Sequence, residues 1–195
     1  MKNLVVFASG SGTNAQNIAE YFNRTKSASV SALFCNNSKA LVVERAKKLN
    51  IPVCLFNRQQ FYDSDYVIDQ LRNFNTDFII LAGFLWLIPA HLIKHYPDRI
   101  INIHPALLPQ YGGKGMYGMA VHEAVIASGE MESGISIHFV DEKYDHGKII
   151  FQARCPVSSG DTPQMLANKI HALEYEFYPK VIEKVLLDAL KQEEF

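Results

Sequence analysis

The stretch LVVFASGSGTNAQNIAEYFNR, residues 4–24, decides the fold of the N-terminal half. Its opening run, LVVFA, is apolar throughout and predicts a buried strand. The next residues form a glycine-rich turn, Gly10-x-Gly12-x-x-Ala15, and helical spacing begins at Thr13. A strand, a tight turn and a helix in this order are the first unit of an α/β protein with a parallel sheet.

The glycine-rich turn predicts a binding site for an anion. Small residues and free N–H groups at a helix N-terminus favour a phosphate, and Ser11, Thr13 and Asn14 add polar donors. A dinucleotide site would also need an acidic residue about 20 residues further on. The sequence reads CNN at residues 35–37, so we expect a phosphate site and not NAD binding. A tight turn without any ligand is the alternative.

Alternating strand and helix signals continue to residue 104 and then change. Strands are expected over 4–8, 29–36, 51–56, 76–84 and 98–104, and helices over 13–24, 39–50, 66–75 and from near Pro89. Later segments predict a helix over 120–129, an antiparallel hairpin from 133–142 and 148–157, and a helix over 160–190. We therefore predict a single α/β domain over residues 1–195. Its sheet is doubly wound, mainly parallel and Rossmann-like, with a C-terminal antiparallel hairpin and a long terminal helix.

The terminal helix also shows its expected buried face. Its apolar side chains recur every three or four residues, at Leu166, Ile170, Leu173 and Phe177. Asp161 or Thr162 can cap its N-terminus.

Composition limits the function classes. Hydrophobic residues make up 48% of the chain and charged residues 20%, as in a globular protein. The net charge of −1 argues against binding to nucleic acid or to a membrane surface. Cys35, Cys54 and Cys155 are far apart and odd in number, which favours reduced thiols in the cytoplasm. No apolar run approaches the 18 residues of a membrane span, and the N-terminus is typical of a first strand, not of a signal peptide.

Two polar residues stand at the end of the strand expected over 98–104. Asn102 and His104 are two apart, so they point to the same face, and Pro105 ends the ladder. Ligands of open α/β sheets bind outside the carboxyl ends of strands. A neutral amide can stabilise an oxyanion and an imidazole can move a proton, so the pair indicates acyl transfer. A packed core histidine is the alternative reading of His104.

The hairpin tip DEKYDHG, residues 141–147, offers a third group. Asp141, Glu142 or Asp145 could orient the imidazole, although an ordinary polar hairpin tip is the better explanation of this segment taken alone. The sequence has no nucleophile elbow and no activated Cys–His pair, which favours direct transfer over a covalent enzyme intermediate. His138 fits a packing role. The histidines that lack a metal-ligand spacing are His91, His95, His122 and His146.

Five motifs carry a resemblance that covers about residues 3–185. They are ASGSGTN (8–14), LAGF followed by IP (81–89), INIHPALLP (101–109), GISIHFVDEKYDHGKII (134–150) and HALEYEFYP (171–179). In this order and spacing they resemble the phosphoribosylglycinamide formyltransferase family, folate-dependent enzymes of purine biosynthesis. The resemblance implies transfer of a formyl group from 10-formyltetrahydrofolate, the co-substrate, to the amine of glycinamide ribonucleotide.

The resemblance also implies roles for three catalytic residues. His104 matches the family's proton-transfer histidine, and Asn102 matches its oxyanion asparagine. Asp145 matches the aspartate that raises the pKa of the histidine and positions water. No metal is implied. The partners implied are small molecules, with no nucleic acid or membrane, for a cytoplasmic monomer or weak homodimer.

The domain is expected to have two halves, and the binding residues implied by the resemblance come from both of them. Residues 1–105 form a phosphate-binding half, and residues 106–195 form the folate-site and C-terminal half. The residues expected to bind the ribonucleotide are Gly12, Thr13, Asn14, His171 and Glu174. Those expected to bind the folate are Leu85, Trp86, Leu87, Ile88, Asn102 and Asp141.

Departures from the family pattern concern the folate contacts. Trp86 stands where some members carry a basic residue, and an arginine that some members use on the folate has no clear counterpart near residues 59–64. The segment 111–125 also looks longer than in some relatives. The alternative functions are another folate-dependent formyltransferase or hydrolase, and a non-catalytic phosphate-binding α/β module.

Overall fold

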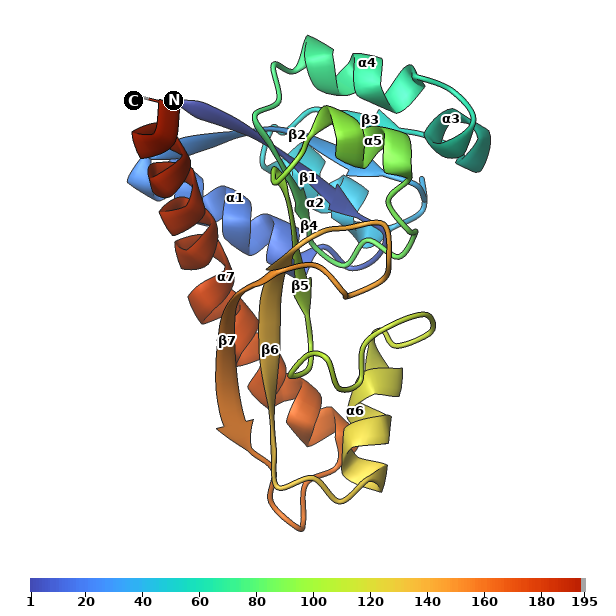
Figure 1. Cartoon of the computed structure of the whole chain (residues 1–195), viewed down its shortest axis with the longest axis vertical. Coiled ribbons are helices and arrows are strands. Elements are labelled where there is room, and N and C mark those ends of the chain that lie inside the picture. Colours follow the sequence, from blue (N-terminus) through green and yellow to red (C-terminus); the bar gives the residue numbers. More distant parts are fainter. Residues whose placement is uncertain (194–195) are drawn as a thin grey trace.

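The computed structural model describes residues 1–193, so the last two residues of the domain expected over 1–195 lie outside it. Seven strands form one sheet in the order β3-β2-β1-β4-β5-β6-β7 (Figure 1). The strands are β1 (Lys2–Ala8), β2 (Ala28–Cys35), β3 (Val53–Leu55), β4 (Phe78–Leu81), β5 (Ile100–His104), β6 (Glu132–Phe139) and β7 (Ile149–Pro156). The helices are α1 (Thr13–Thr25), α2 (Leu41–Lys48), α3 (Arg58–Tyr62), α4 (Tyr66–Asn73), α5 (Ala90–His95), α6 (Met119–Ala127) and α7 (Pro163–Glu193).

The strand pairing confirms the predicted fold class. Strands β1 to β5 pair in parallel, whereas β5 pairs with β6 and β6 with β7 in antiparallel fashion. The first strand lies between β2 and β4, so the chain winds outward in both directions from β1. This reversal of strand order opens a crevice at the carboxyl edge of the sheet, where ligands of such folds bind.

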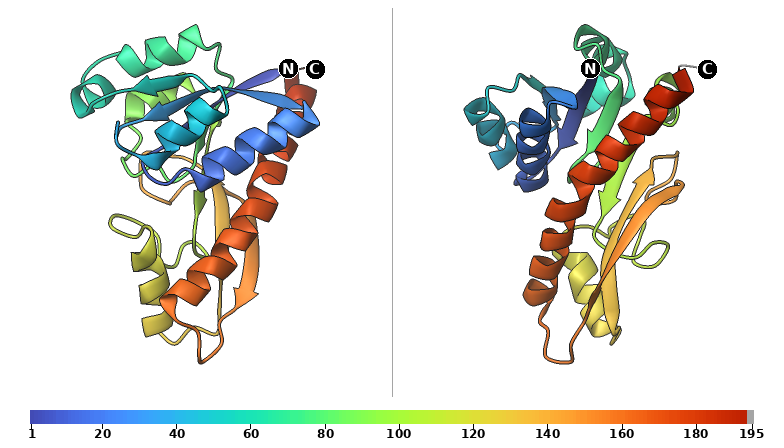
Figure 2. Two further views of the ribbon diagram at one scale, coloured as in Figure 1. Left: turned by 180° about the vertical axis from the view of Figure 1, so that it is seen from behind. Right: turned by 90° about the vertical axis from the view of Figure 1, so that its left-hand side faces the viewer.

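Helices cover both faces of the sheet, and the strand period decides which side chains meet them (Figure 2). In β1, Leu4 and Val6 belong to the core shared with α1, α2 and α7. Val5 and Phe7 belong to the core shared with α3, α4 and α5. All four side chains are at most 1% exposed, as expected of a strand covered on both sides.

The sequence analysis missed α3. Its N-terminus is a capping box: the side chain of Asn57 accepts from the backbone N–H of Gln60, and the side chain of Gln60 accepts from the N–H of Asn57, each at 2.9 Å. This Asn-x-x-Gln spacing is a recognisable sequence signal. The helix has only five residues, too few to show a hydrophobic period.

The predicted apolar stripe of α7 packs against the core, but only half of it is fully buried. Leu166 and Ile170 are fully buried, but Leu173 and Phe177 are only partly buried. Glu174 and Tyr178 are buried as well. Thr162 caps the helix, because its hydroxyl accepts from the N–H of Met165 at 3.2 Å.

The hydroxyl of Tyr178 ties α7 to the sheet. It donates to the carbonyl of Leu81 in β4 at 2.9 Å and to that of Ile101 in β5 at 3.1 Å. These two strands end at the crevice, so Tyr178 holds the helix in register with that edge. Within residues 1–193, none of the helices combines the length and the apolar character needed to cross a bilayer.

We predict that Tyr178→Phe lowers the free energy of unfolding by about 1–3 kcal/mol, because two buried carbonyl groups lose their shared donor. Urea unfolding followed by circular dichroism measures the loss. Tyr175→Phe on the same helix is the control, since the Tyr175 side chain is 38% exposed. Equal stability of the two variants would contradict this role of the Tyr178 hydroxyl.

Candidate active site

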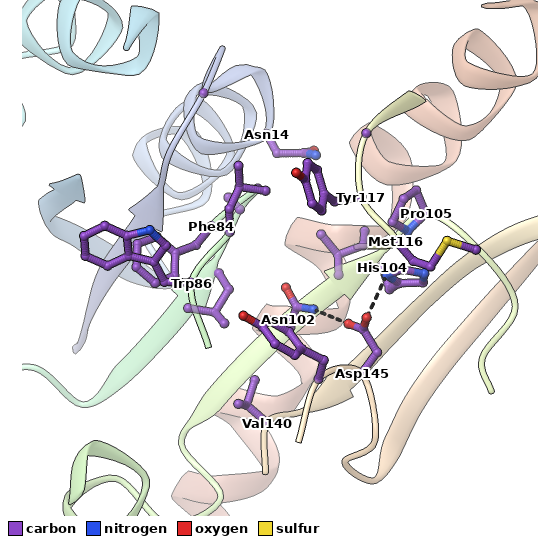
Figure 3. Close-up of a pocket in the computed structure, with 18 of the residues that line it drawn as sticks. Asn14, Phe84, Trp86, Asn102, His104, Pro105, Met116, Tyr117, Val140 and Asp145 are labelled. Carbon is purple, nitrogen blue, oxygen red and sulfur yellow. Dashed lines mark hydrogen bonds and ion pairs between the residues drawn. The ribbon is translucent and has the colours of Figure 1, made fainter. Parts of the chain in front are cut away.

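A pocket of about 640 Å³ opens at the carboxyl edge of the sheet (Figure 3). Its walls come from segments far apart in the chain: the turn after β1, the segment after β4, the end of β5, the following loop and the hairpin tip. Helices α6 and α7 add further lining residues. The pocket therefore lies where the topology predicts a ligand.

The carboxylate of Asp145 lies between Asn102 and His104 (Figure 3). Its Oδ2 is 3.4 Å from Nδ1 of His104, and its Oδ1 accepts from Nδ2 of Asn102 at 3.4 Å. The backbone N–H of Gly113 also donates to Oδ2, at 2.9 Å. Asp145 has a φ of 53°, a left-handed conformation that aspartate tolerates better than most residues. The structure thus brings together the three side chains expected to be catalytic.

His138 completes this cluster, although the sequence analysis treated it as a packing residue. Its Nδ1 lies 2.8 Å from the carbonyl oxygen of Phe139, and its Nε2 lies 3.1 Å from Nδ2 of Asn102 and 3.7 Å from Oδ1 of Asp145. Residue 138 lies directly opposite residue 102 in the β5–β6 ladder. Only this cross-strand register, which no local pattern gives, could have revealed the contact.

Burial decides the charge of His104, whose side chain is 4% exposed. Burial lowers the pKa of His104 below its ordinary value of 6.5. The Asp145 carboxylate and the carbonyl of Tyr111, which accepts from Nε2 at 2.7 Å, raise this pKa without offsetting burial. Asp145 therefore raises the pKa of His104, as expected, but burial has the larger effect. The ring is neutral at neutral pH, with Nδ1 turned toward the carboxylate.

Asp145 itself stays ionised. Burial raises the pKa of Asp145, but the hydrogen bond with His138, the charge of His104 and the N–H of Gly113 together lower it below 3.8. A carboxylate charge is thus held next to a neutral imidazole. This arrangement favours a proton that arrives at Nδ1 of His104.

One end of the pocket is polar and lies at the N-terminus of α1. Gly12 caps this helix with a φ of 76°, and a Cβ at Gly12 would come within 2.2 Å of the Val42 side chain, so only glycine fits. No side chain of the cap satisfies the first N–H groups of α1, which is the arrangement that favours an anion. Thr13 and Asn14 line the pocket beside it.

Asn14 connects this polar end to α7. Its Nδ2 donates to Oε2 of Glu174 at 2.9 Å, and Glu174 is only 6% exposed. Burial raises the pKa of Glu174, while the hydrogen bond from Asn14 and the charge of His171 oppose that rise. His171 and Glu174, which were expected to bind the ribonucleotide, both line the pocket.

The other end of the pocket is apolar and aromatic. Residues 85–88 line it, and the Trp86 ring packs against Phe56, Phe61, Tyr62 and Phe84. Arg58 lies over the ring of Trp86, with its guanidinium carbon 5.8 Å from the ring centre. Arg58 is next to residues 59–64, near which no counterpart of the family's folate-contacting arginine was expected.

Asp141 differs from the other expected folate residues, because it is not part of the pocket lining found within residues 1–193. Its carboxylate accepts from Nδ1 of His146 at 2.7 Å and from the N–H of Lys143 at 2.9 Å. These contacts hold the hairpin tip in place.

The pocket also has lining residues that were not predicted from the sequence, in the loop 113–118 and on α6. The flanking glycines of that loop marked a turn but gave no direction for its side chains.

The comparisons with known proteins agree with this geometry. A family model described as formyl transferase matches residues 2–182. A chloroplastic phosphoribosylglycinamide formyltransferase of Arabidopsis thaliana is 40% identical over 199 residues, covering 99% of this chain and 68% of that protein. The chain spans only 60% of the Vigna unguiculata relative of the same name, at 43% identity over 93% of this chain. A crystal structure of phosphoribosylglycinamide formyltransferase from Bacillus halodurans has a TM-score of 0.85 and 37% identity, over 96% of this chain and 97% of that one.

The chain therefore belongs to the formyl transferase family. The named relatives are all phosphoribosylglycinamide formyltransferases, including one from Bacillus subtilis that is 36% identical over 95% of both chains. The family predicted from the sequence motifs, and with it a formyl-transferring enzyme, is confirmed.

His122 on α6 lies in the wall of this pocket and was not expected there. It is 3% exposed, and its Nδ1 has no hydrogen-bond partner within residues 1–193. Burial, followed by the charges of His171 and His104, lowers the pKa of His122 to about 4. In the unfolded chain, His122 takes up a proton near pH 6.5, whereas in the folded chain it does so only near pH 4. The stability that His122 contributes is therefore present above pH 6.5 and is lost as the pH falls toward 4.

We predict that His122→Asn flattens the pH dependence of stability. Between pH 7 and pH 5, the free energy of unfolding of the unchanged protein should fall by about 2 kcal/mol more than that of the variant. Chemical denaturation at the two pH values measures the difference. The same fall in both proteins would show that His122 titrates normally in the folded state.

Proposed function

We propose that this chain transfers a formyl group from 10-formyltetrahydrofolate to the amine of glycinamide ribonucleotide, by direct attack through a tetrahedral intermediate. The observation that carries the proposal is the contact of Asp145 with both Asn102 and His104 inside the pocket. Membership of the formyl transferase family supports the same reaction.

The two ends of the pocket support two binding sites. In this proposal the half over residues 1–105 holds the ribonucleotide phosphate at Gly12, Thr13 and Asn14. His171 and Glu174 of α7 bind the rest of the ribonucleotide. The flat folate ring lies along Leu85, Trp86, Leu87 and Ile88 and reaches Asn102. The apolar wall of residues 85–88 suits a heterocycle, and the capped turn suits a phosphate.

The proposed chemistry needs only these side chains and the two substrates. The amine nitrogen forms a bond to the formyl carbon, and the bond from that carbon to the folate nitrogen then breaks. Nδ2 of Asn102 stabilises the oxyanion by exchanging its long contact with Asp145 for the formyl oxygen. The proton leaves the amine for the folate nitrogen by way of Nδ1 of His104, or through water held by Asp145. The carboxylate stabilises the imidazolium that forms in between.

We further propose that the enzyme works in the cytoplasm on small molecules alone, as a monomer or weak homodimer, without a metal. A formyl-transfer assay tests the function. The purified chain, incubated with 10-formyltetrahydrofolate and glycinamide ribonucleotide, should yield the formylated ribonucleotide and tetrahydrofolate. Ribonucleotide binding without any transfer would favour the alternative of a non-catalytic phosphate-binding module.

We predict that Asn102→Ala lowers kcat by about 10²–10³, because the oxyanion loses a preorganised donor. The KM of the ribonucleotide should change by less than about threefold, since the donor acts mainly in the transition state. Steady-state kinetics measures both constants, with Asn23→Ala on the exposed surface as the control. A rise in KM at constant kcat would assign Asn102 to ground-state binding.

We predict that Asp145→Asn lowers kcat and moves the acid limb of its pH profile to lower pH. The carboxylate raises the pKa of His104, so its removal leaves burial opposed only by the Tyr111 carbonyl, and the ring protonates only at lower pH. The pH dependence of kcat, compared with that of Asp69→Asn on α4, measures the shift. An acid limb that stays in place or moves to higher pH would contradict the claim that Asp145 raises the pKa of His104.

A further inference from the structure

The packing of α6 against α7 buries His122 next to the polar end of the pocket. The neighbouring α6 residues Val121 and Val125 are buried as well, so this is the inner face of α6. The charges of His171 and His104 both act on the His122 ring, so both residues lie near it. The proposed chemistry gives His122 no role.

Two buried polar atoms at this end of the pocket lack a partner within residues 1–193. They are Nδ1 of His122 and Oδ1 of Asn14. Both residues line the pocket; Asn14 contacts Glu174, and His122 lies near His171. Buried polar atoms in folded proteins are nearly always hydrogen-bonded, so an unpaired pair in a pocket wall indicates where a polar ligand binds.

We propose that His122 is a further ribonucleotide-binding residue, whose ring forms a hydrogen bond with a hydroxyl of the ribose. This inference rests on the proposed function. The turn at Gly12–Asn14 suits the phosphate, and His104 lies where the amine reacts. Glu174 contacts Asn14 of this turn, and His122 lies near both His171 and His104. These side chains therefore line the wall that connects the two points, along which the ribose must lie.

A hydroxyl fits His122 better than a phosphate does. The His122 ring is neutral at neutral pH, because burial and the two neighbouring histidines disfavour its charged form. A neutral imidazole has one donor and one acceptor nitrogen, and a hydroxyl can complement either. A phosphate only accepts hydrogen bonds and carries a charge that a neutral ring does not balance.

The test compares His122→Leu, His122→Asn and the control His95→Asn, an exposed histidine on α5. Each protein is titrated with glycinamide ribonucleotide by calorimetry and assayed for formyl transfer. In His122→Leu, Kd and KM for the ribonucleotide should rise about 3–10-fold, the value of one neutral hydrogen bond. Its kcat and its KM for 10-formyltetrahydrofolate should stay within about twofold of the unchanged protein. His122→Asn keeps a polar group near Nδ1 and should recover most of the loss.

Ribonucleotide analogues that lack one ribose hydroxyl identify the bonded group. Removal of the correct hydroxyl should weaken binding to the unchanged protein by the same 3–10-fold, and should weaken binding to His122→Leu no further. Equal losses in both proteins for each analogue would overturn the proposal. So would an unchanged Kd in His122→Leu, or a loss confined to kcat.

The unchanged protein separates this inference from the proposed function. If it neither binds the ribonucleotide nor transfers a formyl group, the proposed function fails and the inference fails with it. If it does both while His122→Leu matches it in every constant, only the inference fails. Thermal unfolding of each variant confirms that a weaker affinity does not reflect a misfolded protein.

Discussion

The carboxylate of Asp145 joins three parts of the chain that are separate in sequence. It contacts Asn102 and His104 at the end of β5, the N–H of Gly113 in the following loop, and His138 on β6. A buried charge must be matched by donors, and here Nδ2 of Asn102 and the N–H of Gly113 donate to it from two different segments. The position of the hairpin tip, the path of the loop and the orientation of the Asn102 amide all follow from this one requirement.

Burial and charge oppose each other at His104, and burial is the larger effect. The neutral ring presents Nδ1 to an ionised carboxylate, so the site can take up a proton during the reaction and release it again. The sheet keeps these groups in place, because Tyr178 ties α7 to β4 and β5 just behind them. The same helix contributes Glu174 to the polar end, so the hydroxyl of Tyr178 links the stability of the fold to the geometry of the site.

Local sequence periods predicted every helix and strand except the short α3, and also the part of the site that lies on one strand. Asn102 and His104 share a face because side chains alternate along a strand, whatever the rest of the chain does. The direction of Asp145 depends on a turn conformation, and the contact of His138 on strand register, neither of which a local pattern determines. The buried position of Glu174 also escaped prediction, because packing against the sheet sets the rotation of α7 and outweighs the preference of a carboxylate for water.

The central claim is that the formyl group is transferred at the point where Asn102, His104 and Asp145 meet. A crystal structure with glycinamide ribonucleotide and a stable analogue of 10-formyltetrahydrofolate bound together tests it most directly. The account predicts a formyl-equivalent oxygen within hydrogen-bond distance, about 3 Å, of Nδ2 of Asn102, with the attacking amine close to His104. Substrates bound in the pocket with the reacting carbon beyond the reach of all three side chains would contradict it.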